Sequence, residues 1–188
     1  MTTLIIYGHP NTKGHCSLIL NRVKRELRKK KIEYEVIDLY KINYDPVLHE
    51  NEHYTAGNRE VSRQNREFQK KIKESDHLIF IYPVWWSSQP AILKGFLDRV
   101  LVSGYGFKYI NSVPRGLLKG KKATVFMTSG GPMIYYMLTL NPVKRNIRQI
   151  LNFCGVKTKT VQFYSCRKLD EKKERLISRK VLKSLEKL

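Results

Sequence analysis

Residues 78–100 read LIFIYPVWWSSQPAILKGFLDRV, and this stretch decides the fold because it joins a strand-like run to a helical pattern through a loop. Residues 77–82 are mostly apolar over the length of a buried strand. Pro90 suits the first turn of a helix, and the apolar residues after it recur at helical spacing. These residues are Ile92, Leu93, Phe96, Leu97 and Val100. The stretch therefore predicts a strand, a loop and a helix over residues 77–101.

The same alternation of strand and helix extends along the whole chain. Further strands are predicted at residues 3–7, 34–39, 122–128 and 156–163. Further helices are predicted at residues 17–31, 58–73, 133–153 (interrupted by Pro142) and 170–188. Strands that alternate with helices pair in parallel, because each parallel connection needs a crossover. We therefore expect a single α/β domain over residues 1–188, built on a doubly wound sheet of five parallel strands.

The composition narrows the class of protein. The chain has 188 residues, with 36 Lys and Arg against 16 Asp and Glu, and a formal net charge of +20. With 41% hydrophobic residues it is too apolar to be a disordered basic tail. Its three cysteines contain no C-x-x-C pair, which favours a reducing compartment over a disulfide framework. Since neither a membrane-spanning run nor a signal-peptide pattern is evident, we expect a cytoplasmic protein.

Ligands of doubly wound sheets bind beyond the carboxyl ends of the strands, so three loops are candidates for a site. Residues 8–17 contain two glycines and feed a helix, which suits a phosphate group; a merely capped helix start is the alternative. Trp85 and Trp86 are adjacent after the third strand, so at least one is available to a flat ligand or a partner. Gly130 and Gly131 follow the fourth strand, where a simple turn is the alternative to a close ligand contact.

Together the three loops suit a ligand with a phosphate at one end and a planar ring at the other, as in a flavin nucleotide. Residues 82–100 are similar to the signature of the flavodoxin-like NAD(P)H:quinone oxidoreductase family, and residues 7–10 and 104–109 fit the same family. The resemblance extends from residue 7 to about residue 155. It implies a flavodoxin-like, three-layer fold with strand order 2-1-3-4-5, and a flavin-dependent enzyme.

The resemblance also implies which residues bind the cofactor. The residues implied to hold the flavin phosphate are His9, Ser17, Leu18 and Ile19. Those implied to line the isoalloxazine ring are Pro83, Val84, Trp85, Trp86 and Ser87. Those implied to meet the other edge of the ring are Thr128, Ser129, Gly130 and Gly131. No residues with metal-ligand spacing accompany them, so no metal is expected.

Two residues are implied to take part in the reaction. Tyr136, with Tyr135 as the alternative, helps to polarise the flavin and the substrate, and Trp86 forms a wall against which nicotinamide and acceptor stack. The implied mechanism is ping-pong: NAD(P)H gives hydride to flavin N5 and leaves, and a quinone or similar planar acceptor takes its place. Because the chain is short for the family, FMN is expected, with FAD as the alternative. Animal members have a histidine after the tyrosine, whereas no histidine follows His77 here.

The excess of positive charge lies on the outer faces of the predicted helices 17–31 and 170–188. Such faces are either simply solvated or attract an anionic partner. The resemblance implies a homodimer, and the charge fits an acidic membrane surface or a membrane transporter. Specific nucleic-acid binding is not expected, because exposed aromatic residues are not interleaved with the basic ones. Two other functions stay open at this point: an ancillary flavoprotein subunit of a membrane transporter and a flavodoxin-type electron carrier.

Overall fold

Five strands form one parallel sheet in the computed structural model, which describes residues 1–53, 55–56, 60–186 and 188. The strands are β1 (Thr2–Tyr7), β2 (Glu33–Asp38), β3 (His77–Pro83), β6 (Lys122–Thr128) and β7 (Lys157–Phe163). Their order across the sheet is β2-β1-β3-β6-β7, and every neighbouring pair is parallel. The predicted doubly wound sheet with order 2-1-3-4-5 is therefore confirmed.

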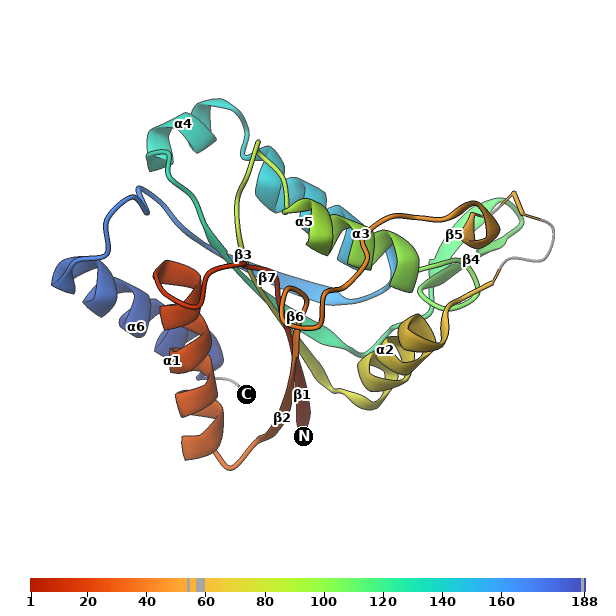
Figure 1. Cartoon of the computed structure of the whole chain (residues 1–188), viewed down its shortest axis with the longest axis horizontal. Helices are drawn as coiled ribbons and strands as arrows, with labels where there is room; N and C mark the ends of the chain where they lie inside the picture. The colour runs from red at the N-terminus through yellow and green to blue at the C-terminus, as the bar shows by residue number, and fades with distance from the viewer. Residues whose placement is uncertain (54, 57–59, 187) are drawn as a thin grey trace.

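Helices cover both faces of this sheet (Figure 1). The helices are α1 (His15–Lys29), α2 (Arg63–Glu74), α3 (Ala91–Val100), α4 (Met133–Leu138), α5 (Pro142–Phe153), α6 (Glu171–Leu185) and the short 3₁₀ turn η1 (Glu50–Glu52). Helices α1 and α6 share one core with the sheet, and α2, α3 and α5 share the other. In the described part of the chain, no helix is long and apolar enough to cross a membrane.

Strand β3 lies at the centre of the sheet and is buried along its whole length. Alternate side chains of a strand point to opposite faces. Accordingly, Leu78 and Phe80 pack into the core under α2, α3 and α5, whereas Ile79 and Ile81 pack into the core under α1 and α6. A strand buried on both faces needs a helical layer on each side. This requirement explains why the 77–82 run has no polar face.

Three details differ from the expectations. The predicted helix 133–153 is two helices, because Leu140 and Asn141 adopt positive φ and Asn141 caps α5 ahead of Pro142. A hairpin of β4 (Phe107–Ile110) and β5 (Val113–Gly116) was not expected from the sequence. Helix α2 begins at Arg63 with Ser62 as its N-cap; the predicted start at Asn58 lies outside the described residues.

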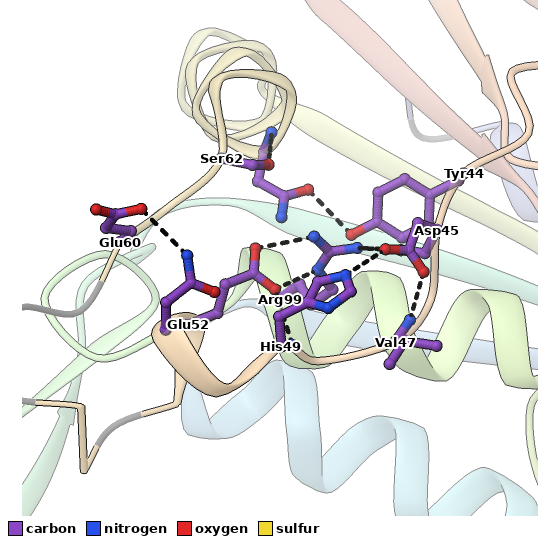
Figure 2. Close-up of polar contacts among 10 residues, drawn as sticks. Tyr44, Asp45, Val47, His49, Glu52, Glu60, Ser62 and Arg99 are labelled. Atoms are coloured by element: carbon purple, nitrogen blue, oxygen red, sulfur yellow. Dashed lines mark hydrogen bonds and ion pairs between the residues drawn. The ribbon is translucent and has the colours of Figure 1, made fainter.

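The segment between β2 and η1 is held against α3 by Arg99, as Figure 2 shows. The Arg99 guanidinium donates two hydrogen bonds to the Glu52 carboxylate, at 2.7 and 2.9 Å, and pairs with Asp45 at 3.1 Å. The side chains of Arg99 and Glu52 are only 7% and 8% exposed. The guanidinium also lies over the Tyr44 ring, 5.6 Å from its centroid. A buried cation is therefore fully paired here, as burial of a charge requires.

We predict that Arg99→Met lowers the free energy of unfolding by about 3–5 kcal/mol, because it leaves the buried Glu52 carboxylate unpaired. The matched control is Lys94→Met, one turn earlier on α3, which breaks the exposed Lys94–Asp98 pair. That change should cost less than about 1 kcal/mol. Urea unfolding of both variants measures the difference. Equal losses in the two variants would show that burial of the pair has no bearing on its contribution.

His77 begins β3 as a buried imidazole. Its Nε2 lies 2.9 Å from Thr124 Oγ1, and its Nδ1 has no hydrogen-bond partner among the described residues. Burial, reinforced by the positive charges of Lys122 and Lys159, lowers the pKa of His77 to about 4. The folded protein therefore keeps this imidazole neutral at pH values where the unfolded chain, with an ordinary pKa near 6.5, takes up a proton.

This difference in proton uptake predicts a stability loss in mild acid. Since only the unfolded state binds the proton between about pH 6.5 and pH 4, stability should fall across that window and level off below it. The full contribution is about 3 kcal/mol. The variant His77→Gln retains a polar side chain but cannot titrate, so it should lose this part of the pH dependence in urea unfolding. An unchanged slope in the variant would contradict the assignment.

Candidate active site

Three loops meet at the carboxyl edge of the sheet, because they follow the adjacent strands β1, β3 and β6. Backbone hydrogen bonds tie their starts together, from Gly8 N to Ile81 O at 3.0 Å and from Val84 N to Thr128 O at 2.7 Å. Between the loops is a cavity of about 420 Å³. The residues expected at a site that line it are His9, Pro83, Val84, Trp85, Thr128, Ser129 and Gly130.

The amino terminus of α1 forms one end of this cavity. Gly14 is the N-cap residue, with φ of 100°, and no side chain caps the helix. The first amide groups of α1 are therefore free to bind an anion, which the helix dipole also favours. Lys13, Gly14, His15 and Cys16 all line the cavity. All four belong to the 8–17 segment that was expected to suit a phosphate group, although none is among the contacts that the family resemblance implies.

His15 adds a side chain to this anion-binding end. Its Nε2 is buried and has no hydrogen-bond partner among the described residues. Burial lowers the pKa of His15, although a hydrogen bond to the Lys168 backbone opposes this effect. An orphaned imidazole nitrogen beside free helix amides fits a phosphate group, which would supply the missing partner.

Cys16 and Cys166 line the same cavity. The Cys16 sulfur lies 3.3 Å from Thr128 Oγ1, which joins α1 to the end of β6. Burial raises the pKa of Cys16 to about 12, and burial also raises the pKa of Cys166. Both thiols are therefore protonated at neutral pH. They shape the cavity wall and do not act as thiolate nucleophiles.

The two tryptophans occupy a tight turn after β3. Trp85 and Ser88 exchange backbone hydrogen bonds of 3.1 and 2.9 Å. Trp86 and Ser87 between them have φ of 48° and 55°, as in a type I′ turn. Trp85 lines the cavity, with its ring 6.4 Å from that of His9, whereas Trp86 is fully exposed at the tip of the turn. The adjacent tryptophans therefore have different environments.

Tyr136 lies behind the glycine loop. It is buried, and its ring packs edge-on against Tyr135, with centroids 5.2 Å apart. A Cβ added to Gly131 would lie 3.2 Å from the Tyr136 ring, whereas one added to Gly130 would meet open space. Gly130 thus leaves room for a ligand, and Gly131 gives room to Tyr136. Tyr135 is half exposed.

Several residues expected at the site do not line the cavity: Ser17, Leu18, Ile19, Trp86, Ser87, Gly131 and Tyr136. Ile19 is fully buried in the core between α1 and the sheet. For Ser17, Leu18 and Ile19 the difference arises because α1 begins at His15, two residues before the expected start. The cavity residues that the family resemblance does not imply are Asn11, Lys13, Gly14, His15, Cys16 and Cys166, of which all but Cys166 lie in the 8–17 segment expected to suit a phosphate. The sequence signal for a ligand contact in residues 8–17 was the pair of glycines, Gly8 and Gly14.

Comparison with known proteins supports the flavodoxin-like architecture described above. A family described by its flavodoxin-like fold matches residues 1–188, so the chain belongs to that family. An uncharacterized NAD(P)H oxidoreductase of Haemophilus influenzae is 33% identical over 162 residues, covering 83% of this chain and 79% of the relative. An FMN-dependent NADH:quinone oxidoreductase of Lachnoclostridium phytofermentans is 33% identical over 127 residues, covering 66% of this chain and 63% of the relative. The structure of an NAD(P)H:quinone oxidoreductase from Methanothermobacter marburgensis superposes with a TM-score of 0.84 at 26% identity, covering 98% and 94% of the two chains.

Proposed function

We propose that this protein is an FMN-dependent NAD(P)H:quinone oxidoreductase. The observation that carries the proposal is the cavity itself, with free helix amides at one end and an aromatic, glycine-bearing wall at the other. Its volume of about 420 Å³ falls within the usual range for small-ligand pockets, roughly 300–1,000 Å³. The activities of the relatives, NAD(P)H oxidation and quinone reduction, support the same reaction class. FMN is favoured over FAD because a relative that is 33% identical is named as FMN-dependent.

We assign the cofactor contacts as follows. The phosphate lies at the start of α1, held by the first amide groups and by His15, with Lys13 and His9 beside it. The ring lies between the 83–85 segment and residues 128–131, with Trp85 as its aromatic neighbour. This assignment moves the main phosphate contact from Ser17, Leu18 and Ile19 to residues 14–16. Ser17 contributes its backbone amide, since it belongs to the first turn of α1.

Bound FMN supplies the redox chemistry, accepting hydride from NAD(P)H and passing two electrons to a quinone or similar planar acceptor. The protein binds and orients the reactants. We propose that Trp86, exposed beside the cavity, is a wall for the nicotinamide and the acceptor in turn. We propose that Tyr136 supports the glycine loop and offers its hydroxyl near Gly131, where the family's additional histidine is lacking.

We also propose that the protein is a cytoplasmic homodimer. Its three free cysteines fit a reducing compartment. The dimer proposal is supported by a second, larger groove of about 1,430 Å³, lined by residues 48, 52, 53 and 56 and by parts of α3, β4 and α5. Exposed apolar side chains, among them Tyr109 and Phe153, line this groove. Burial of such a surface by a second copy would remove it from water.

The function is tested on the purified protein. We expect a flavin absorption spectrum, or its appearance after reconstitution with FMN, and oxidation of NADH or NADPH that menadione stimulates. A protein that binds neither FMN nor FAD would refute the whole proposal. NAD(P)H oxidation without any stimulation by a quinone would refute only the acceptor class.

The role of His15 predicts a phosphate-dependent loss of affinity. His15→Ala should weaken FMN binding by about 10- to 100-fold, because a hydrogen bond to a charged group is lost. Binding of riboflavin, which has no phosphate, should not change. FMN binding by the unchanged protein should also strengthen as the pH falls towards 6, since the phosphate dianion favours the protonated imidazole. Quenching of flavin fluorescence measures each affinity.

The matched control is His49→Ala, which removes an imidazole that lies outside the cavity and contacts Asp45. It should leave the affinity for FMN as it is. Equal loss of FMN and riboflavin binding in His15→Ala would contradict the phosphate assignment and place His15 in a general packing role.

A further inference from the structure

Ser129, which lines the candidate active site, holds the loop after β6 to the end of β7 and the residues that follow it. The N–H and the hydroxyl of Ser129 both donate to the Phe163 carbonyl oxygen, at 2.9 and 3.1 Å. The Ser129 carbonyl oxygen accepts a hydrogen bond of 2.9 Å from Cys166 N, and Gly131 O accepts one of 2.9 Å from Ser165 N. Both donors of Ser129 are therefore used within the protein, and neither is left for a ligand.

Gly130 lies between these two anchored residues and is itself open to the cavity. It is exposed, and a Cβ placed on it would meet open space. Among the described residues, neither its N–H nor its C=O has a hydrogen-bond partner. The anchoring of Ser129 and Gly131 therefore determines where the unpaired Gly130 backbone lies in the cavity wall.

Gln162 binds the Ser129 hydroxyl from inside the protein. It is 2% exposed and does not line the cavity. Its Nε2 donates to Ser129 Oγ at 3.2 Å, and its Oε1 accepts a hydrogen bond of 2.9 Å from Asn141 Nδ2. Buried side chains bonded at both ends form a rigid connection. Gln162 thus joins the cavity wall to Asn141, the residue that caps α5.

Asn141 is in turn held by the two helices that it separates. Its φ is 45°, a conformation that asparagine tolerates better than most residues do. Its N–H donates to the Tyr136 carbonyl oxygen at 2.7 Å, at the end of α4. Its Oδ1 accepts a hydrogen bond of 3.3 Å from Lys144 N in the first turn of α5. The remaining group, Nδ2, is directed to Gln162, with the Tyr164 hydroxyl as a longer contact at 3.4 Å.

The direction of the hydrogen bonds in this connection is fixed at both ends. Because Lys144 N can only donate, Asn141 presents Oδ1 to it and Nδ2 to Gln162. Because the Phe163 carbonyl can only accept, the Ser129 hydroxyl donates to it and accepts from Gln162. A reversed Gln162 amide would bring its nitrogen against Asn141 Nδ2, and two donors would then face each other. The Gln162 side chain therefore has one favourable orientation.

We propose that Gln162 is a positioning residue for the candidate active site. It acts through Ser129 and fixes the 129–131 loop, whose contact with a flavin ring rests on the proposed function. The anchoring of the loop does not depend on which ligand binds. Since the ring is common to FMN and riboflavin, loss of Gln162 should weaken the binding of both equally, in contrast to the phosphate-dependent effect of His15→Ala.

The first test needs no ligand. Amide hydrogen exchange of the ligand-free protein, followed by NMR, measures local opening of the loop. Gln162→Met keeps a side chain of similar length and removes the amide. In this variant the amides of Ser129, Ser165 and Cys166 should exchange about tenfold faster, as expected for the loss of a buried hydrogen bond. Unchanged exchange of these three amides would overturn the proposal.

The second test is flavin affinity, measured by quenching of flavin fluorescence. Gln162→Met should weaken the binding of FMN and of riboflavin by the same factor, about tenfold. Ser129→Ala breaks the same connection from its other end, so it replaces Gln162→Met if that variant does not fold. The double variant should bind flavin no more weakly than Ser129→Ala alone, because Gln162 then has no hydroxyl to hold. Additive losses, or a loss confined to FMN, would overturn the proposal.

The matched control is Asn65→Ala. Asn65 is a buried amide residue of α2, 1% exposed, which accepts a hydrogen bond of 3.0 Å from the Tyr44 hydroxyl and does not line the cavity. Its replacement should leave both flavin affinities unchanged, and the three loop amides should exchange as before relative to those of β3. Equal effects of Asn65→Ala and Gln162→Met would overturn the proposal in favour of general destabilisation. If the unchanged protein binds no flavin but the loop amides respond as expected, the proposed function fails and the positioning role of Gln162 stands.

Discussion

The burial of β3 on both faces is the constraint on which the rest of the structure depends. Seven consecutive buried residues need a strand on each edge and a helical layer on each face. The neighbours β1 and β6 run parallel to β3, so the three strands end at one edge. The loops that follow these three strands therefore emerge at the same edge of the sheet. The cavity at that edge is thus a consequence of core packing, and its chemistry comes from the loop residues alone.

The type and order of the helices and strands could be predicted because the spacing of apolar residues shows which side chains are buried. In this sheet, the pattern of burial distinguishes the strands from the helices that cover them. The β4–β5 hairpin could not be predicted in the same way. Its strands have four residues each and are mostly exposed, so they carry no clear alternation. The break between α4 and α5 did have a signal, since Asn141-Pro142 is a capping residue followed by proline at N1. Pro142 alone predicts only an interruption within one helix, whereas the pair with Asn141 predicts a new helix start.

The candidate site was predicted less well than the fold, for a reason of capping chemistry. The apolar periodicity predicts a helix from Ser17, and the family resemblance implies phosphate contacts at Ser17, Leu18 and Ile19. The helix instead begins after Gly14, which leaves its first amides uncapped. An uncapped start costs stability but leaves donors for a ligand, so propensity rules mislead where a helix end is kept free for binding. Cys166 reaches the cavity through a hydrogen bond to Ser129, a long-range contact without any local signal.

Two features at this edge of the sheet are unfavourable, one in backbone conformation and the other in the solvation of apolar side chains. Trp86 and Ser87 hold positive φ, which costs a non-glycine residue roughly 1–2 kcal/mol. Helix α4 exposes apolar side chains at a further cost in solvation. Both costs fall at the edge of the sheet where the loops after β3 and β6 emerge. Because neither feature adds to the burial of the core, we interpret both as serving a ligand or partner at this edge and not the stability of the fold.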